Sequence, residues 1–192
     1  DYLGFTLFLP TLFTAPYYGY SEYRFAMGCR TGDSVLFLKG LKSYIIGMGK
    51  TVLLGAGMVA MWSEINAIDK SLISPAAALL GLFAAAFAVY YILTGYNDMS
   101  VGLGGMFGFE MAKGYDHPIF ARGFIDFLKR FQVYMWNWTQ RYVIAEAEMN
   151  SHIIYFVLWI MLMLLYGMEA NLLIWGVLFG VFASAEYYLL DL

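Results

Sequence analysis

The segment Pro75–Leu93 holds 19 consecutive residues without a formal charge, most of them Ala, Leu or Phe. A helix of about 20 apolar residues crosses the hydrocarbon core of a lipid bilayer. Two further uncharged runs, Met149–Met168 and Ala170–Ala185, are separated by one acidic residue, Glu169. This pattern predicts an all-α, multi-pass membrane protein in which Glu169 lies at the turn between two spans.

The composition supports this class and argues against several others. Hydrophobic residues make up 61% of the 192 residues and charged residues 13%, whereas soluble domains carry about 25% charged residues. The net charge of −3, without a basic stripe, argues against a nucleic-acid partner. One cysteine, Cys29, and two separated histidines, His117 and His152, offer no disulfide framework and no metal site. We expect no metal and no cofactor.

The other apolar segments bring the expected number of spans to four or five. Tyr44–Trp62 is long enough to cross and carries one charge, Lys50, while Glu22–Lys42 before it is interpreted as a polar connection. Tyr2–Ser21 is uncharged but interrupted by two prolines, which suits a span or a half-span. Thr94–Ala121 is rich in glycine. We expect a broken or re-entrant helix there, covered by protein or by a wet cavity.

The stretch Ile119–Tyr142 differs from its surroundings because it combines four cations with eight aromatic side chains. A charged, aromatic helix between spans lies at the membrane interface or lines a polar cavity. Each Lys or Arg at the bilayer centre costs about 2.5–3.5 kcal/mol on insertion scales, so we expect this helix not to span. Lys129 and Arg130 are placed to meet a phosphate group, and they can equally extend to lipid headgroups. We assign Lys129 and Arg141 to lipid headgroups.

Asp98 and its neighbour Asn97 lie in the glycine-rich segment. An acid within membrane-embedded sequence is a candidate functional residue. The structural alternative is that Asp98 pairs with a cation such as Arg130, or caps a broken helix. Further residues expected to line a cavity or to support the architecture are Arg130, Trp136, Asn171 and Trp175.

Five segments of the chain match known sequence patterns in the same order. Thr94–Phe109, TGYNDMSVGLGGMFGF, is similar to the pattern SGYSDMAIGLARLFGF, and Phe127–Tyr142, FLKRFQVYMWNWTQRY, resembles FWRRWHISLSTWLRDY. The other three segments are Phe5–Pro16, Lys39–Leu54 and Leu164–Gly180. Together they resemble the motifs of the membrane-bound O-acyltransferase (MBOAT) family, most of all the bacterial branch that acetylates alginate or moves D-alanine toward teichoic acid. The resemblance implies a helical MBOAT core, shortened here, and a link to O-acyl transfer.

Two histidines characteristic of the family have no counterpart, because their positions hold Gln132 and Tyr166. The resemblance implies that a histidine at the position of Tyr166 would accept the proton of the attacking hydroxyl. Histidine suits this role with a pKa near 6.5, whereas tyrosine, with a pKa near 10, is a poor base at neutral pH. A glycine-rich stretch that follows the aromatic helix in the family is also absent. The departures predict a catalytically degenerate homologue.

We therefore expect a structural or accessory subunit of a larger membrane complex, without acyl transfer at a rate typical of the family. The alternative is an active or split O-acyltransferase that moves an acyl group to a hydroxyl acceptor. A channel or transporter subunit is a third class, which fits a broken helix with Asp98 but lacks an internal repeat. The resemblance indicates the bacterial cytoplasmic membrane, with a single transmembrane domain over residues 1–192.

Two pairs of glycines four residues apart, Gly104 with Gly108 and Gly176 with Gly180, form surfaces of the small-xxx-small type. Such surfaces pack either within the chain or against another subunit. Backbone groups freed by prolines and glycines within a membrane need protein partners or a wet cavity. We expect membrane lipids and other integral membrane subunits as partners. The expected contact regions are Tyr2–Pro16 and Gly102–Gly108.

Overall fold

A computed structural model describes residues 2–8, 20–30, 32–69, 71–131, 133–141 and 151–190, and every regular element within these ranges is a helix. The chain divides into two compact units, Asp1–Lys113 and Gly114–Leu192. Each unit is described by itself. The expected all-α class is confirmed for the described ranges, while the single domain over residues 1–192 stays a prediction.

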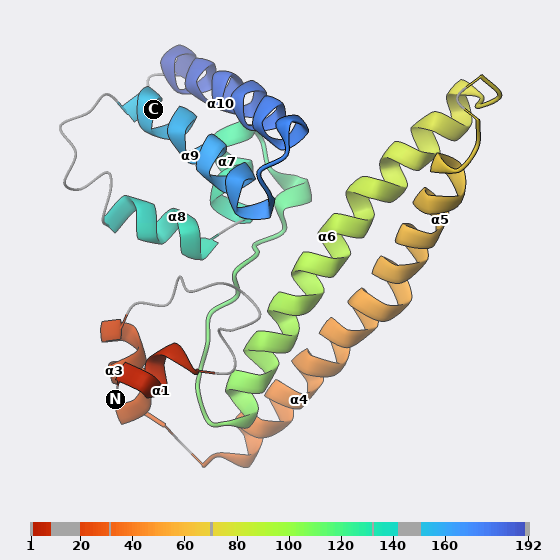
Figure 1. The fold of residues 1–192 in the computed structure, drawn as a ribbon. Coiled ribbons are helices and arrows are strands. Elements are labelled where there is room, and N and C mark those ends of the chain that lie inside the picture. The colour runs from red at the N-terminus through yellow and green to blue at the C-terminus, as the bar shows by residue number, and fades with distance from the viewer. Residues whose placement is uncertain are drawn as a thin grey trace. The chain divides into compact units, whose positions relative to one another are not determined.

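A long helical hairpin dominates the first unit (Figure 1). One arm runs without interruption through α4 (Ser34–Gly49), the π-helix η1 (Lys50–Gly55) and α5 (Ala56–Asn66), and the other arm is α6 (Pro75–Met106). The arms comprise 33 and 32 residues, or roughly 50 Å each at 1.5 Å per residue. The first arm therefore begins well before the expected span, and Ser34–Lys42 is helical, not a polar connection.

Capping residues set where both arms begin. The Asp33 side chain accepts a hydrogen bond of 2.9 Å from the Val35 amide at the start of α4. Ser74 accepts one of 3.2 Å from the Ala77 amide at the start of α6, and Pro75 occupies the first turn. Both arrangements satisfy amides that have no partner within the helix. The local sequence thus determines the residue at which each arm of the hairpin begins.

The glycine-rich segment Thr94–Ala121 does not form the expected broken or re-entrant helix. Its first part continues α6 to Met106, because glycine in a helix costs only about 1 kcal/mol relative to alanine. The helix ends at Gly108, which has a φ of 84°. The Phe109 amide donates to the Gly104 carbonyl at 2.8 Å, and the Gly108 amide to that of Gly105 at 3.1 Å. This is the Schellman arrangement, in which one glycine in the left-handed region ends a helix.

Two short helices, α1 (Tyr2–Thr6) and α3 (Tyr20–Gly28), complete the first unit through aromatic contacts. Phe5 meets the ring of Tyr23 edge to face at 5.6 Å, and Tyr23 is buried. Phe8 contacts the Phe109 ring at 5.0 Å, so the segment after α6 belongs to this cluster. Pro10 and Pro16, on which the expected span or half-span depended, lie outside the described residues.

The second unit contains a hairpin of α9 and α10 with shorter helices before it. Glu169 lies in the turn between them, as the sequence predicts, and its carbonyl accepts from the Leu172 amide at 3.0 Å. Gly176 and Gly180 face α9, where an added Cβ would lie 3.2 Å from the Cα of Ile160 or 2.8 Å from Cδ2 of Phe156. This glycine pair thus packs within the chain. The elements are η2 (Pro118–Phe120), α7 (Phe124–Phe131), α8 (Val133–Thr139), α9 (Ser151–Tyr166) and α10 (Ala170–Leu190).

The stretch Ile119–Tyr142 is not one helix, because it includes most of η2 and then the separate helices α7 and α8. The α7 helix is amphipathic, with Ile125 and Leu128 buried. Phe124 stacks on Phe182 of α10 with ring centroids 5.0 Å apart. The aromatic side chains thus hold α7 to the hairpin of its own unit, and an interfacial location of this region stays a prediction.

Three helices in the described residues are long and apolar enough to cross a membrane: Ser34–Asn66, Pro75–Met106 and Ala170–Leu189. The α9 helix, at 16 residues, is shorter than the roughly 20 residues that a perpendicular span needs. Four or five spans therefore remain an expectation. The three candidate spans support a membrane protein.

Candidate functional site

The arms of the first hairpin touch backbone to backbone. A Cβ added to Gly40 would lie 2.6 Å from the Gly102 carbonyl oxygen, and one added to Gly47 would lie 2.5 Å from that of Gly95. Contacts this short leave no room for a side chain on either helix. Small residues permit this kind of close approach in membrane helices. Gly95, Gly102 and Gly105 of α6 are thus explained by contact with the first arm inside one chain.

This close approach brings Lys50 and Asp98 together. The Lys50 Nζ atom lies 2.5 Å from Oδ2 of Asp98, whose residue is 8% exposed. The Ser43 hydroxyl donates a 3.0 Å hydrogen bond to the Asp98 backbone carbonyl. Ion pairs that are partly removed from water need such direct geometry to offset the loss of hydration. The cation partner of Asp98 is therefore Lys50, and Arg130, named from the sequence as an example, lies in the second unit with partners there.

Lys50 is also the first residue of the π-helical segment η1. At its end the Ala56 amide donates to the carbonyl of Thr51, five residues earlier. The Thr51 hydroxyl donates to the Gly47 carbonyl at 3.1 Å. Short π-helical turns inside α-helices are rare and occur frequently at functional sites. The π-helical turn of η1 changes the helical register at the position where the Lys50 side chain meets α6.

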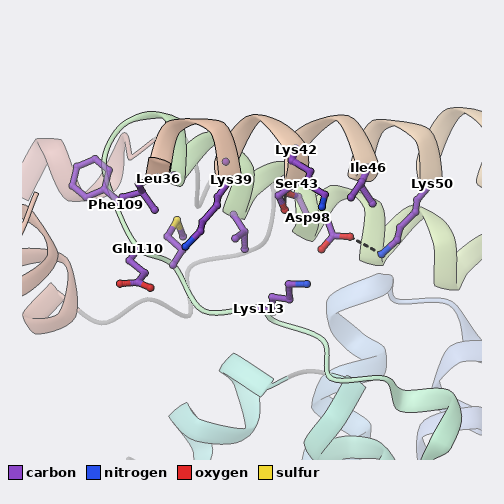
Figure 2. A pocket seen from close by; sticks show the side chains of 14 residues that line it. Leu36, Lys39, Lys42, Ser43, Ile46, Lys50, Asp98, Phe109, Glu110 and Lys113 are labelled. Carbon is purple, nitrogen blue, oxygen red and sulfur yellow. Dashed lines mark hydrogen bonds and ion pairs between the residues drawn. The ribbon is translucent and has the colours of Figure 1, made fainter. Parts of the chain in front are cut away.

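A pocket of about 400 Å³ opens beside this ion pair (Figure 2). Lys39, Lys42 and Lys50 follow one another at spacings of three and eight residues, which places them along one face of the first arm. Figure 2 shows Lys39 and Lys50 extending from that arm toward the space beside Asp98. The pocket is lined by Leu36, Lys39, Gly40, Lys42, Ser43, Ile46, Lys50, Asp98, Val101, Gly105, Phe109, Glu110, Met111 and Lys113. Its lining thus contains four lysines and two carboxylates.

The second unit has its own charged cluster, outside the candidate spans. The Arg130 Nε atom donates to Asp126 Oδ1 at 2.9 Å, and an Arg130 terminal nitrogen lies 3.8 Å from Oδ2 of Asp116. The backbone N–H of Arg122 and the side chain of Arg130 together lower the pKa of Asp126 below its usual value. Lys129 lies over the Trp136 ring at 5.1 Å. This cluster is a network of ion pairs and a cation–π contact.

An α10 carboxylate supports the start of α7. Glu186 Oε2 accepts hydrogen bonds from the amides of Phe124 at 2.5 Å and Ile125 at 3.3 Å. A carboxylate at a helix N-terminus satisfies free amides and interacts favourably with the helix dipole. Gly123 leaves the space that Glu186 fills, since a Cβ there would collide with the carboxylate. This cap was not predicted from the sequence, which shows only an acid near the end of an apolar run.

The residues singled out in the sequence belong to both units, and each is described within its own unit. Asn97 and Asp98 are buried in α6, and Asp98 lines the pocket. Asn171 and Trp175 are exposed on α10, where Trp175 stacks on Phe179 at 5.5 Å. Tyr166 ends α9, but its side chain lies outside the described residues, as does all of Gln132. Of the remaining candidates, Lys129 and Arg141 are exposed, and Arg130 and Trp136 are partly exposed.

The lysine face of α4 was missed from the sequence, although a signal for it is present. Interpreting Glu22–Lys42 as a polar connection hid the helical spacing of Lys39 and Lys42 with Lys50. The spacing becomes visible once the helix is started at its cap, Asp33. The pairing with Asp98 depends on how α4 and α6 are aligned, and neither helix specifies that by itself.

No model of a protein family matches the chain. Curated relatives do match 97% of it at low identity. The probable alginate O-acetylase AlgI of Pseudomonas aeruginosa is 22% identical and that of Azotobacter vinelandii 23%, with 36% and 38% of those proteins covered. The peptidoglycan O-acetyltransferase of Helicobacter pylori is 23% identical, with 37% covered. The chain thus spans little more than a third of the length of these proteins. The motifs and these low-identity matches thus agree that the chain is similar to proteins of the membrane-bound O-acyltransferase family.

Proposed function

We propose that this chain is part of a membrane-bound O-acyltransferase that moves an acyl group to a hydroxyl acceptor. The observation that carries the proposal is the match of 97% of the chain to proteins named as O-acetyl-transferring enzymes. Acetyl is accordingly the acyl group we propose. The three apolar helices support a location within a membrane. We infer the bacterial cytoplasmic membrane from the relatives.

In such an enzyme the first hairpin contributes two closely packed apolar helices with an ion pair between them. The Lys50–Asp98 pair lies between two apolar helices, beside a pocket. Its part in the proposed reaction is positioning, because the pair fixes α4 against α6. The described residues place no histidine side chain inside a helix pair, and His117 is exposed beside Asp116 at 3.1 Å. We do not assign the proton-accepting group to any of them.

The substitutions at the family's histidine positions favour a second function. Gln132 has no basic nitrogen, and tyrosine, the residue at position 166, is a poor base at neutral pH because its ordinary pKa is near 10. A chain with these residues fits an accessory or structural subunit of a membrane complex. In that role Lys129 and Arg141 bind lipid headgroups, the aromatic helices α7 and α8 lie at the interface, and further membrane subunits contact the chain.

An acyl-transfer assay separates the two functions. The protein containing this chain is supplied in membranes with an acetyl thioester and a polysaccharide hydroxyl acceptor, and new acetate ester is measured. Turnover that is reduced at least tenfold by Asp98→Asn but not by Glu64→Gln supports the transferase. Turnover lost in Tyr166→Phe would identify that phenol as a proton-transfer group. Folded protein without turnover for any donor supports the accessory subunit and rejects the transferase.

A further inference from the structure

The pocket of the first hairpin is positively charged although the chain as a whole is negative. Four of its fourteen lining residues are lysines and two are carboxylates, in a chain with a net charge of −3. Lys50 and Asp98 neutralise each other at 2.5 Å. The remaining charges are Lys39, Lys42 and Lys113 against Glu110 alone. Such a concentration of one sign in a concave site favours an anionic ligand.

The three remaining lysines are available to a ligand. No carboxylate among the described residues lies within ion-pair distance of Lys39, Lys42 or Lys113. All three are exposed. They come from two separate segments, the α4 face and the chain that follows α6, so they approach the pocket from different directions (Figure 2). Three ammonium groups arranged this way match the several oxygens of a phosphate better than the two oxygens of a carboxylate.

The length of the hairpin places these lysines at the level of lipid phosphates. The turn between its arms is polar, and the exposed Asp69 there accepts from the Ser71 amide at 3.0 Å. With this turn at one membrane surface, Asp98 lies 23 residues beyond Pro75, or roughly 35 Å along α6. The hydrocarbon core is about 30 Å thick and the bilayer with headgroups about 40–45 Å. Asp98 therefore lies just beyond the hydrocarbon of the opposite surface.

The same measure applies to the first arm. Lys42 lies 24 residues before Asn66, the end of that arm, or roughly 36 Å from the turn. Lys39 is one helical turn further out. Both lysines thus lie in the headgroup layer, whereas the apolar lining residue Ile46, 20 residues or roughly 30 Å from the end of the arm, faces the same pocket from nearer the hydrocarbon side. A ligand with a phosphate next to an apolar part fits this order of side chains.

From these observations we propose that the pocket binds a phosphate group through Lys39, Lys42 and Lys113. The group comes either from an anionic phospholipid headgroup or from a diffusible phosphate ester. The Lys50–Asp98 pair holds the two helices that form the site, and Ile46 contacts the apolar part of the ligand. This site does not depend on the acyl-transfer proposal, since it stands on the charge, the position and the lining of the pocket.

Native mass spectrometry of the chain in a nonionic detergent tests the proposal. The protein is titrated with dioctanoyl phosphatidylglycerol, with dioctanoyl phosphatidylcholine and with pyrophosphate. Binding of phosphatidylglycerol that pyrophosphate does not displace identifies a lipid headgroup as the source. Tight binding of pyrophosphate itself identifies a diffusible phosphate ester. Wild-type protein that binds none of the anionic probes more tightly than phosphatidylcholine overturns the proposal.

Substitutions locate the site. A charge–headgroup contact near the surface is worth about fivefold in affinity per lysine, so Lys39→Gln/Lys42→Gln/Lys113→Gln is expected to weaken binding of the favoured probe at least tenfold. The arginine triple at the same positions keeps the charge and is expected to bind within about threefold of wild type. The comparison of the arginine triple with the wild type remains informative if the glutamine triple does not fold. Weak binding by a folded arginine triple would contradict the proposal.

Two further variants control for general electrostatics. Glu110→Gln removes the opposing carboxylate and is expected to tighten binding about fivefold. Arg24→Gln/Arg122→Gln removes two positive charges at exposed cations outside the pocket. It is expected to change the affinity by less than threefold. Equal weakening per charge removed in this variant and in the glutamine triple would show that only net charge matters and would reject the site.

Discussion

The two helical hairpins of this chain use the same small residues for different contacts. In the hairpin of α4 and α6, Gly40 and Gly47 lie closest to backbone atoms of the facing helix, with Gly47 against Gly95. In the hairpin of α9 and α10, Gly180 lies against the Phe156 side chain and backbone. The two atoms closest to the Gly47 position are backbone atoms, which cannot move aside, whereas the atom closest to the Gly180 position belongs to an aromatic ring, which can turn. Glycine thus gives a rigid contact in one hairpin and an adaptable one in the other.

The polar residues of the two hairpins differ as well. The first contains an ion pair between its arms, Lys50 with Asp98. The second contains a carboxylate, Glu186, directed at a neighbouring helix, and a stack of Trp159 on Phe179 at 4.9 Å between its arms. In the first hairpin the close backbones bring the two charged side chains together at a defined position. In the second hairpin aromatic rings fill the contact between the arms. Removing each feature tests this contrast.

The largest effect is expected for Asp98→Ala, which leaves Lys50 without its partner. Removing one member of a buried ion pair costs about 3–5 kcal/mol, and the Lys50 side chain is 33% exposed. We therefore expect the free energy of unfolding to fall by about 3 kcal/mol, the low end of that range. Thermal or SDS-induced unfolding in detergent measures it.

The control for this prediction is Glu64→Ala on the same hairpin, an exposed acid expected to change stability by less than about 0.5 kcal/mol. The double variant Lys50→Met/Asp98→Leu is expected to be less destabilised than the sum of the two single variants, because it removes both charges together. Additive effects would show that the two residues do not interact.

Gly47→Ala is expected to have the next largest effect. Its Cβ would lie 2.5 Å from the Gly95 carbonyl oxygen, so the two backbones must move apart. Overpacking of this kind costs about 1–3 kcal/mol. Gly49→Ala, two residues along the same helix and with open space around it, is expected to be neutral or slightly stabilising because alanine favours the helix.

The same substitution in the second hairpin sharpens the comparison. Gly180→Ala meets the Phe156 ring at 2.8 Å and its carbonyl oxygen at 3.1 Å. Rotation of the ring relieves the shorter contact. We therefore expect the free energy of unfolding to fall less than for Gly47→Ala in the same assay. An equal or greater loss at Gly180 would remove the distinction between rigid and adaptable contacts.

Local rules in the sequence predict much of the fold, and the pairing of helices decides the rest. Uncharged runs predict the first part of α6, most of α10 and the turn at Glu169. The continuation of α6 beyond Thr94 was missed because glycines were interpreted as helix breakers, when Gly95 and Gly102 serve contact with α4. In the candidate site, too, the local sequence predicts one part and the pairing of helices decides the other. Asp98 is recognisable as an acid in an apolar setting, whereas its pairing with Lys50 requires the alignment of two helices.

Glu186→Ala tests the polar contact of the second unit. It removes the acceptor for the amides of Phe124 and Ile125 at the start of α7. Loss of a helix N-cap costs about 0.5–2 kcal/mol, typically about 1 kcal/mol. Hydrogen exchange at these two amides is expected to accelerate, while amides in α4 and α6 keep their protection. Glu169→Ala is the matched control, because only the backbone of Glu169 accepts hydrogen bonds in the described turn. Unchanged exchange in Glu186→Ala would exclude the cap.

The smallest effect concerns Asp126 on α7 and appears only at acidic pH. The backbone N–H of Arg122, and then the Arg130 side chain, lower the pKa of Asp126 in the folded state. Its contribution to stability is therefore complete above the unfolded value, about 3.9, and is lost as the pH falls through the lower folded value. We expect the protection of α7 amides to decrease on acidification from pH 5 to pH 2, and Asp126→Asn to remove that part of the decrease. The effect is small because the pair is partly exposed and solvent screens it. The first hairpin contains no such exposed pair among its described residues, so its pH dependence over this range is expected to be unaffected by Asp126→Asn. A matching change in α4 and α6 would mean that the two units do not respond separately.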